Sequence, residues 1–230
     1  MPPMIASRPS NFRRVRLGAI FYVSTLQYFL VQLLVSLRWS LAYSLSRNTI
    51  SDLGNTACGK FNGRYVCSPL HSLMNVSFVL LGLAMIGGSL LVCRSTPTTR
   101  GQTVGFVSIA IGGVGAVMVG FFPENTIPAF HGIGATLPFL IGNIGLFVLG
   151  LSLGGPATLR VYTVLSGLVA LTFLAFYATS HYLGLGEGGI ERVVAYPQTL
   201  WLIVFGTYLI VTSSSAEVFV PPAPVTTVPN

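Results

Sequence analysis

Charged residues are scarce in this sequence. Only 7% of its 230 residues are Asp, Glu, Lys or Arg, whereas a typical soluble domain contains about 25%. A water-soluble domain could not cover its surface with so few charges, so this class is excluded. Hydrophobic residues make up 52% of the chain, and they occur in blocks of about 20 residues, the length that crosses a bilayer as a helix. The composition therefore predicts an integral membrane protein.

Several catalytic and ligand-binding motifs are also missing. The chain has no Gly-x-Ser-x-Gly nucleophile elbow and no Walker-type loop. Its three histidines lie in different segments and form no HxxxH or HExxH pair, so neither a metal site nor a cofactor is predicted. The excess of basic residues lies in flanks and loops, where it fixes membrane orientation. It therefore does not indicate a nucleic-acid partner.

Six apolar segments have no charge at their centres. Backbone groups in lipid must be paired within the segment, and the short alternating segments of a membrane barrel are absent. Each segment is therefore predicted to be a helix, and the fold an all-α integral membrane bundle of six transmembrane helices. The predicted segments are Leu17–Leu37, Pro69–Cys93, Thr103–Phe122, Ala129–Leu153, Val161–Leu183 and Val194–Ser213.

The sequence outside these segments is short. Residues 1–16 form a basic tail, and residues 17–213 form the single membrane domain, in which loop 38–67 is the longest polar stretch. Residues 214–230 are rich in Pro, Val and Thr, a composition that predicts a disordered tail.

The arginines predict the orientation of the chain. Arg8, Arg13, Arg14 and Arg16 precede the first segment, and cytoplasmic flanks carry an excess of Lys and Arg. We therefore expect the N-terminus in the cytoplasm, and six crossings return the C-terminus to the same side. The expected protein is a multi-pass protein of the cell membrane with loop 38–67 on the outer side.

Two of the cysteines lie in this loop. Cys58 and Cys67 would face an oxidising compartment if the loop is outside the cell. A disulfide between them is predicted. Cys93 lies at the inner end of the second segment and is expected to be a free thiol.

Most of the remaining ionisable side chains are predicted to lie on the outer side. All three histidines lie at outer ends of segments, and Glu217 is the only acidic residue on the inner side. Ionisable residues near the membrane are candidates for function, so we expect a polar site there. His131 could form an acid–base pair with Asp52 or Glu124. Candidate binding residues are His71, Asn75, His181, Arg47, Glu191 and Arg192.

Topology predicts that several of these residues converge. Odd-numbered crossings bring the chain out, so Asp52, His71, His131 and the Glu191–Arg192 pair all lie at one depth. We expect them to face the interior of the bundle, with His131 within hydrogen-bond reach of an acid or separated from it by one water.

An anionic ligand would be recognised by arginine. The guanidinium fork matches phosphate oxygens. Arg47 or Arg192 would therefore pair an anionic headgroup.

Four stretches of the sequence have a distinctive pattern of polar residues and glycines. They are Asn-Thr-Ile-Ser-Asp-Leu-Gly at 48–54, Pro-Leu-His-Ser-Leu-Met-Asn at 69–75, Phe-Phe-Pro-Glu-Asn at 121–125 with His-Gly-Ile-Gly-Ala at 131–135, and Gly-Ile-Glu-Arg-Val at 189–193 with Trp201. Together they resemble the bacterial and archaeal membrane family called domain of unknown function 998. The similarity covers about residues 15 to 212 and implies a six-helix membrane protein. A more distant similarity, to the Frag1/DRAM/Sfk1 group, implies a connection with lipids.

These observations leave three functions open. The leading one is recognition or handling of a membrane lipid or a lipid-linked group at the outer leaflet. The second is a membrane-embedded hydrolase or transferase that uses His131 with Asp52 or Glu124. The third is a non-catalytic assembly subunit with a protein partner in the membrane. A transporter is disfavoured, because no charge lies in mid-membrane and the two halves show no inverted repeat.

Overall fold

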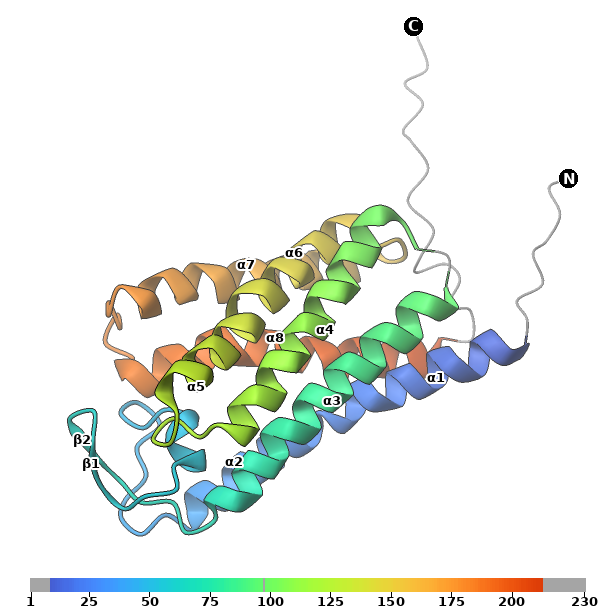
Figure 1. Cartoon of the computed structure of the whole chain (residues 1–230). Helices are drawn as coiled ribbons and strands as arrows, with labels where there is room; N and C mark the ends of the chain where they lie inside the picture. The colour runs from blue at the N-terminus through green and yellow to red at the C-terminus, as the bar shows by residue number, and fades with distance from the viewer. Residues whose placement is uncertain (1–8, 97, 213–230) are drawn as a thin grey trace, which may run out of the picture.

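A computed structural model describes residues 9–96 and 98–212 (Figure 1). The predicted tail 214–230 and the first half of the predicted tail 1–16 lie outside these residues. The described chain contains six segments that are helical, long and apolar enough to cross a membrane, which confirms the predicted six-helix membrane bundle. They are Phe12–Leu37, His71–Ser95, Arg100–Phe121, Pro128–Ser152, Ala157–Ala178 and Gly186–Val211.

The first crossing consists of two helices, α1 (Pro9–Ser24) and α2 (Leu26–Leu37). They are separated at Thr25, whose hydroxyl donates a hydrogen bond of 2.6 Å to the carbonyl oxygen of Tyr22. Threonine side chains that bond the preceding turn compete with the regular helical pattern, which explains the interruption.

The second and third crossings are single helices, α3 (His71–Ser95) and α4 (Arg100–Phe121). The start of α4 is fixed by a capping box. The Thr99 hydroxyl accepts from the backbone N–H of Gln102, and the Gln102 side chain accepts from the backbone N–H of Thr99. The two bonds satisfy donors that have no partner inside the helix.

The fourth crossing changes its helical form in the middle. It runs through α5 (Pro128–Thr136), the π-helical segment η2 (Leu137–Gly142) and α6 (Asn143–Ser152). Pro138 lies within η2 and has no backbone N–H to continue an α-helical ladder. A local π turn is a common response to such a lost bond.

The last two crossings are α7 (Ala157–Ala178) and α8 (Gly186–Val211). Helix α8 begins well before Val194, where the sixth segment was predicted to start. Gly188 donates from its backbone N–H to the carbonyl of Ser46 at 2.9 Å. The protein itself therefore covers the polar first turns of α8, and these turns do not need to be apolar.

The loop between α2 and α3 is folded. It contains a 3₁₀ turn and a two-stranded antiparallel hairpin. The hairpin turn is Asn62–Gly63, with φ values of 44° and 76°, as a type I′ turn requires. A disulfide joins Cys58 to Cys67 across the hairpin, which confirms the predicted bridge, and Cys93 is a free thiol. The elements are η1 (Ser51–Gly54), β1 (Gly59–Phe61) and β2 (Arg64–Val66).

The crossings form a closed ring in sequence order, because each packs on the next and α8 packs back on α1 (Figure 1). Two ends can be distinguished. The hairpin end carries loops 38–70, 122–127 and 179–185, and the terminal end carries the start of α1 and the end of α8. A buried aromatic cluster fills the middle of the ring and the part toward the terminal end: Tyr22, Phe106, Trp201 and Phe205.

Labelling of single cysteines tests the orientation. Arg47 at the hairpin end and Arg100 at the terminal end are both exposed. In a Cys93→Ser background, we expect a membrane-impermeant maleimide to label Arg47→Cys on intact cells. Arg100→Cys should react only after permeabilisation, because basic flanks are retained in the cytoplasm.

The parent Cys93→Ser protein is the control. It should stay unlabelled, because its other cysteines are joined in a disulfide. Labelling of position 100 but not of position 47 on intact cells would show that the chain has the opposite orientation.

Candidate functional site

Arg192 attaches the first loop to the start of α8. Its Nη1 donates to the carbonyl oxygens of Leu45, Asn48 and Gly188 at 3.0, 2.8 and 2.7 Å. Its Nη2 donates to the hydroxyl of Tyr43. Both terminal nitrogens of Arg192 are thus engaged by the protein, and its pairing with a headgroup stays a prediction.

Asp52 organises the loop around its own carboxylate. The side chain is 0% exposed and accepts hydrogen bonds from Asn48 Nδ2 (3.1 Å), Thr49 N (3.0 Å), Arg64 Nε (2.6 Å) and Arg64 Nη2 (2.9 Å). Both carboxylate oxygens are therefore occupied. These contacts hold the loop together around Asp52.

Arg64 connects the hairpin to the rest of the protein. Its Nη1 lies 2.7 Å from Glu187 Oε2 on α8, and its other nitrogens bind Asp52. Burial lowers the pKa of Arg64, but the hydrogen bonds and charge of Asp52 outweigh this effect and raise it overall. Neither Arg64 nor Glu187 was predicted as a site residue. The available signal was that Arg64 is the only arginine inside the loop that the disulfide closes.

Glu124 lies on the connection between α4 and α5. It accepts a hydrogen bond of 2.9 Å from Asn55 Nδ2. Next to it, Asn125 Oδ1 accepts from the backbone N–H of Thr56 at 3.1 Å. Burial, together with the nearby carboxylate of Asp52, raises the pKa of Glu124 to about 8. Folding therefore favours the protonated form of this carboxyl group.

His131 contacts the first loop from α5. Its Nδ1 lies 2.9 Å from the carbonyl oxygen of Phe122, and its Nε2 lies 3.1 Å from Ser51 Oγ. Ser51 Oγ in turn lies 3.3 Å from Glu191 Oε1, and Glu191 Oε2 accepts from the backbone N–H of Ile50 at 2.5 Å. The path from His131 to an acid therefore runs through a serine hydroxyl to Glu191.

The predicted partners of His131 were different. Within the described chain, the side chain of His131 has no hydrogen bond to Asp52 or Glu124. Ser51 was not singled out from the sequence, although it directly precedes Asp52 in one of the stretches that carry the family resemblance.

His71 and Asn75 lie at the start of α3 and form hydrogen bonds with the loop. His71 Nδ1 lies 2.9 Å from the carbonyl oxygen of Ser68, and Asn75 Nδ2 donates to the carbonyl of Gly54 at 2.9 Å. Asn75 thereby holds the last residue of η1, so both predicted binding residues contact the backbone of the loop.

His181 and Arg47 lie apart from these contacts. Both are exposed, and His181 Nδ1 lies 2.9 Å from the carbonyl oxygen of Thr179. Among the residues that the structure describes, no three His, Cys, Asp or Glu side chains are grouped closely enough to hold a metal ion.

A cavity of about 680 Å³ lies between the fourth and fifth crossings at the hairpin end. Helix α5 packs on α4, whereas α7 packs on α6 and α8, so α5 and α7 diverge (Figure 1). The polar end of the cavity is lined by Thr49, Ser51, Asn62, Arg64, Glu124, His131, Glu187 and Glu191. Its apolar walls include Ala135, Phe139, Leu140, Leu171, Leu174, Ala175 and Ala178.

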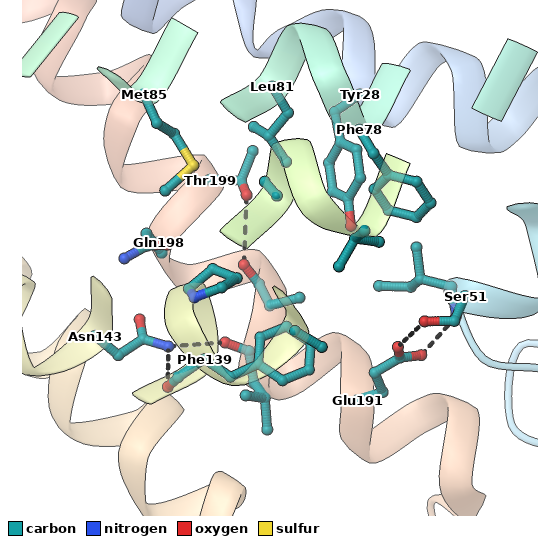
Figure 2. Close-up of a pocket in the computed structure, with 17 residues that line it drawn as sticks. Tyr28, Ser51, Phe78, Leu81, Met85, Phe139, Asn143, Glu191, Gln198 and Thr199 are labelled. Carbon is teal, nitrogen blue, oxygen red and sulfur yellow. Dashed lines mark hydrogen bonds between the residues drawn. The ribbon is translucent and has the colours of Figure 1, made fainter. Parts of the chain in front are cut away.

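A second, smaller cavity of about 50 Å³ lies deeper in the bundle (Figure 2). Ser51 and Glu191 line both cavities, and Figure 2 shows them joined by a hydrogen bond at one side of the smaller one. The rest of its lining is mostly apolar and includes Phe78, Leu81 and Met85. Ser51 and Glu191 therefore lie at the junction of the two spaces.

Six membrane-crossing helices with a polar cluster and a cavity at one end define a multi-pass membrane protein. The chain matches the family described as Protein of unknown function (DUF998) over residues 22–208, and it belongs to this family. No curated protein and no solved structure matches the chain. The similarity to the Frag1/DRAM/Sfk1 group stays a prediction.

Removal of Arg64 tests the ion pair with Asp52. The Arg64→Ala substitution leaves a fully buried carboxylate without its cation, and breaking a buried pair costs about 3–5 kcal/mol. We therefore expect a clear fall in the midpoint of thermal unfolding, measured by tryptophan fluorescence in detergent.

Lys60→Ala is the matched control, because Lys60 is an exposed cation on the same hairpin. It should unfold at the wild-type temperature. Equal midpoints for the two variants would mean that the ion pair contributes nothing to stability.

Glu124 should make stability depend on pH. Its pKa rises from 4.5 to about 8 on folding, so the folded state binds this proton more tightly than the unfolded state does. That stabilisation is complete below pH 4.5 and is lost as the pH rises toward 8. Wild type should therefore lose thermal stability relative to Glu124→Gln between about pH 5 and pH 9. Melting curves recorded side by side would show it, and parallel pH profiles would contradict it.

Proposed function

We propose that the protein binds an amphipathic lipid, or a lipid-linked molecule, in the cavity between α5–η2 and α7 at the outer leaflet of the cell membrane. The observation that carries this proposal is the division of one cavity into a polar end and apolar walls. Its volume of about 680 Å³ is within the usual range of ligand pockets, about 300–1,000 Å³.

The position of the apolar walls of the cavity supports the binding of a lipid tail. The fourth and fifth crossings are neighbours in the ring, so the space between them borders the lipid. Leu171 lies seven residues from Ala178 at the end of α7, which is about 10 Å along a helix. The apolar walls thus reach into the hydrocarbon region, where an acyl chain could enter from the side.

The hydrogen-bonding groups of the polar end support a particular class of headgroup. Three glutamates line the cavity, Glu124, Glu187 and Glu191, with Arg64 as the only Lys or Arg among the lining residues. The Arg64 guanidinium is already bound by Asp52 and Glu187. Carboxyl oxygens accept hydrogen bonds, so an ammonium or hydroxyl-rich headgroup is favoured over the strongly anionic one expected from Arg47 or Arg192.

The orientation of the site follows from the arginine-rich N-terminal flank. Arg13, Arg14 and Arg16 lie at the terminal end, and basic flanks remain in the cytoplasm. The cavity would then open at the outer leaflet, and the disulfide would face an oxidising compartment.

Native mass spectrometry of the protein extracted from its own membrane tests lipid binding. We expect one lipid with a zwitterionic or sugar headgroup to remain bound to the wild-type protein. Ala175→Trp should lose it, because the indole would occupy the cavity between α7 and α5.

Leu168→Trp is the control. Leu168 is exposed on the same helix and does not line the cavity, so this variant should retain the lipid. A wild-type protein free of lipid, or an Ala175→Trp variant that binds as much as wild type, would contradict the proposal. If a protein subunit co-purifies with the wild type and no lipid does, the assembly function replaces it.

A further inference from the structure

Ser51 is held between two potential proton acceptors. Its Oγ lies 3.1 Å from Nε2 of His131 and 3.3 Å from Oε1 of Glu191. The three residues are far apart in the sequence, separated by 80 and 140 positions from Ser51, and come from η1, α5 and α8. The single hydroxyl proton of Ser51 can therefore be donated either to the Glu191 carboxylate or to the ring nitrogen of His131.

The tautomer of His131 follows from its other contact. Nδ1 lies 2.9 Å from the carbonyl oxygen of Phe122, and a carbonyl oxygen can only accept a hydrogen bond. Nδ1 therefore carries the hydrogen. In the neutral ring Nε2 is then unprotonated, and its lone pair faces Ser51 Oγ. This is the arrangement in which a histidine can remove a proton from a serine.

The hydroxyl is also placed where a substrate could reach it. Ser51 lines the larger cavity next to His131, so a group bound at the polar end would lie beside both side chains. An ester that joins an acyl chain to a headgroup is located between the apolar and polar parts of a lipid. Ala135 follows His131 by about one helical turn on α5 and also lines the cavity, so the change from polar to apolar lining occurs beside His131 and its partner Ser51.

We infer that Ser51 is the nucleophile of an acyl-transfer reaction on an ester-linked lipid, with His131 as its general base. The inference rests on the proposed function, because the lipid in the cavity is the acyl donor. It adds a chemical step that binding alone does not require.

The step conserves atoms and charge. Ser51 Oγ attacks the ester carbonyl carbon while its proton moves to Nε2 of His131. The tetrahedral adduct collapses, the bond to the alcohol oxygen breaks, and that oxygen takes the proton from Nε2. The products are an acyl ester on Ser51 and the deacylated alcohol. Water or a second alcohol then attacks the acyl-serine by the same proton transfers and restores the free hydroxyl.

An alkyl fluorophosphonate tests the nucleophile, because it phosphonylates activated serines and its chain fits an apolar wall. We expect peptide mass spectrometry of the full-length protein in lipid nanodiscs to find the adduct on Ser51. His131→Asn keeps a donor for the Phe122 carbonyl but removes Nε2, and should slow labelling by about 10²–10⁴-fold. Ser51→Ala should remove the adduct. Ser72→Ala, an exposed serine on α3 at the same end, should react like wild type.

Two results would overturn the inference. One is a folded wild-type protein, with its disulfide intact and a sharp melting transition, that gains no adduct on Ser51. The other is equal labelling rates in wild type and His131→Asn, which would remove His131 as the base.

Lipid measurements on the same samples separate this inference from the proposed function. If wild type and Ser51→Ala retain the lipid but wild type is not labelled, only acyl transfer fails. Labelling of Ser51 in a protein that holds no lipid would instead overturn lipid binding and leave the activated serine.

Discussion

The contact between Arg64 and Asp52 holds together the hairpin end of the protein. The Asp52 carboxylate is fully buried and would be costly to leave without a cation. The same arginine also binds Glu187 at the start of α8. A disulfide-closed hairpin, a 3₁₀ turn and the last helix are thereby fixed to one another, and with them Ser51 is fixed opposite His131. The polar end of the cavity depends on this loop staying in place.

Local sequence properties predicted much of the fold. The six crossings follow from hydropathy, because lipid requires every crossing to be apolar and internally hydrogen-bonded. The Cys58–Cys67 bridge follows from two cysteines in one loop. Alternation of crossings predicted that His131 and Glu191 lie at the same end, and one serine now connects them.

The detailed contacts could not be predicted, because they depend on the path of the chain between helices. Arg192 was expected at a headgroup, but the loop passes over α8 and brings three carbonyl oxygens to its guanidinium. Asp52 was expected to form an acid–base pair with His131, whereas in the structure its carboxylate binds Arg64 from the hairpin. Neither the contact of Arg192 with the loop nor that of Arg64 with Asp52 produces a periodic pattern in the sequence. Ser51 could be recognised as part of the site only once its neighbours in the structure were known.

The π-helical segment Leu137–Gly142 determines which way two distant side chains point. His131 and Asn143 are twelve residues apart, and an unbroken α-helix, at about 100° per residue, would leave them about 120° out of phase. A π turn accommodates one additional residue and removes about 100° of that difference. Both side chains can then face inward, with 9% and 1% exposed. A substitution that converted this segment to a regular α-helix without removing a residue would restore the difference of about 120° and rotate His131 away from the interior, so the phase of this helix is itself part of the site.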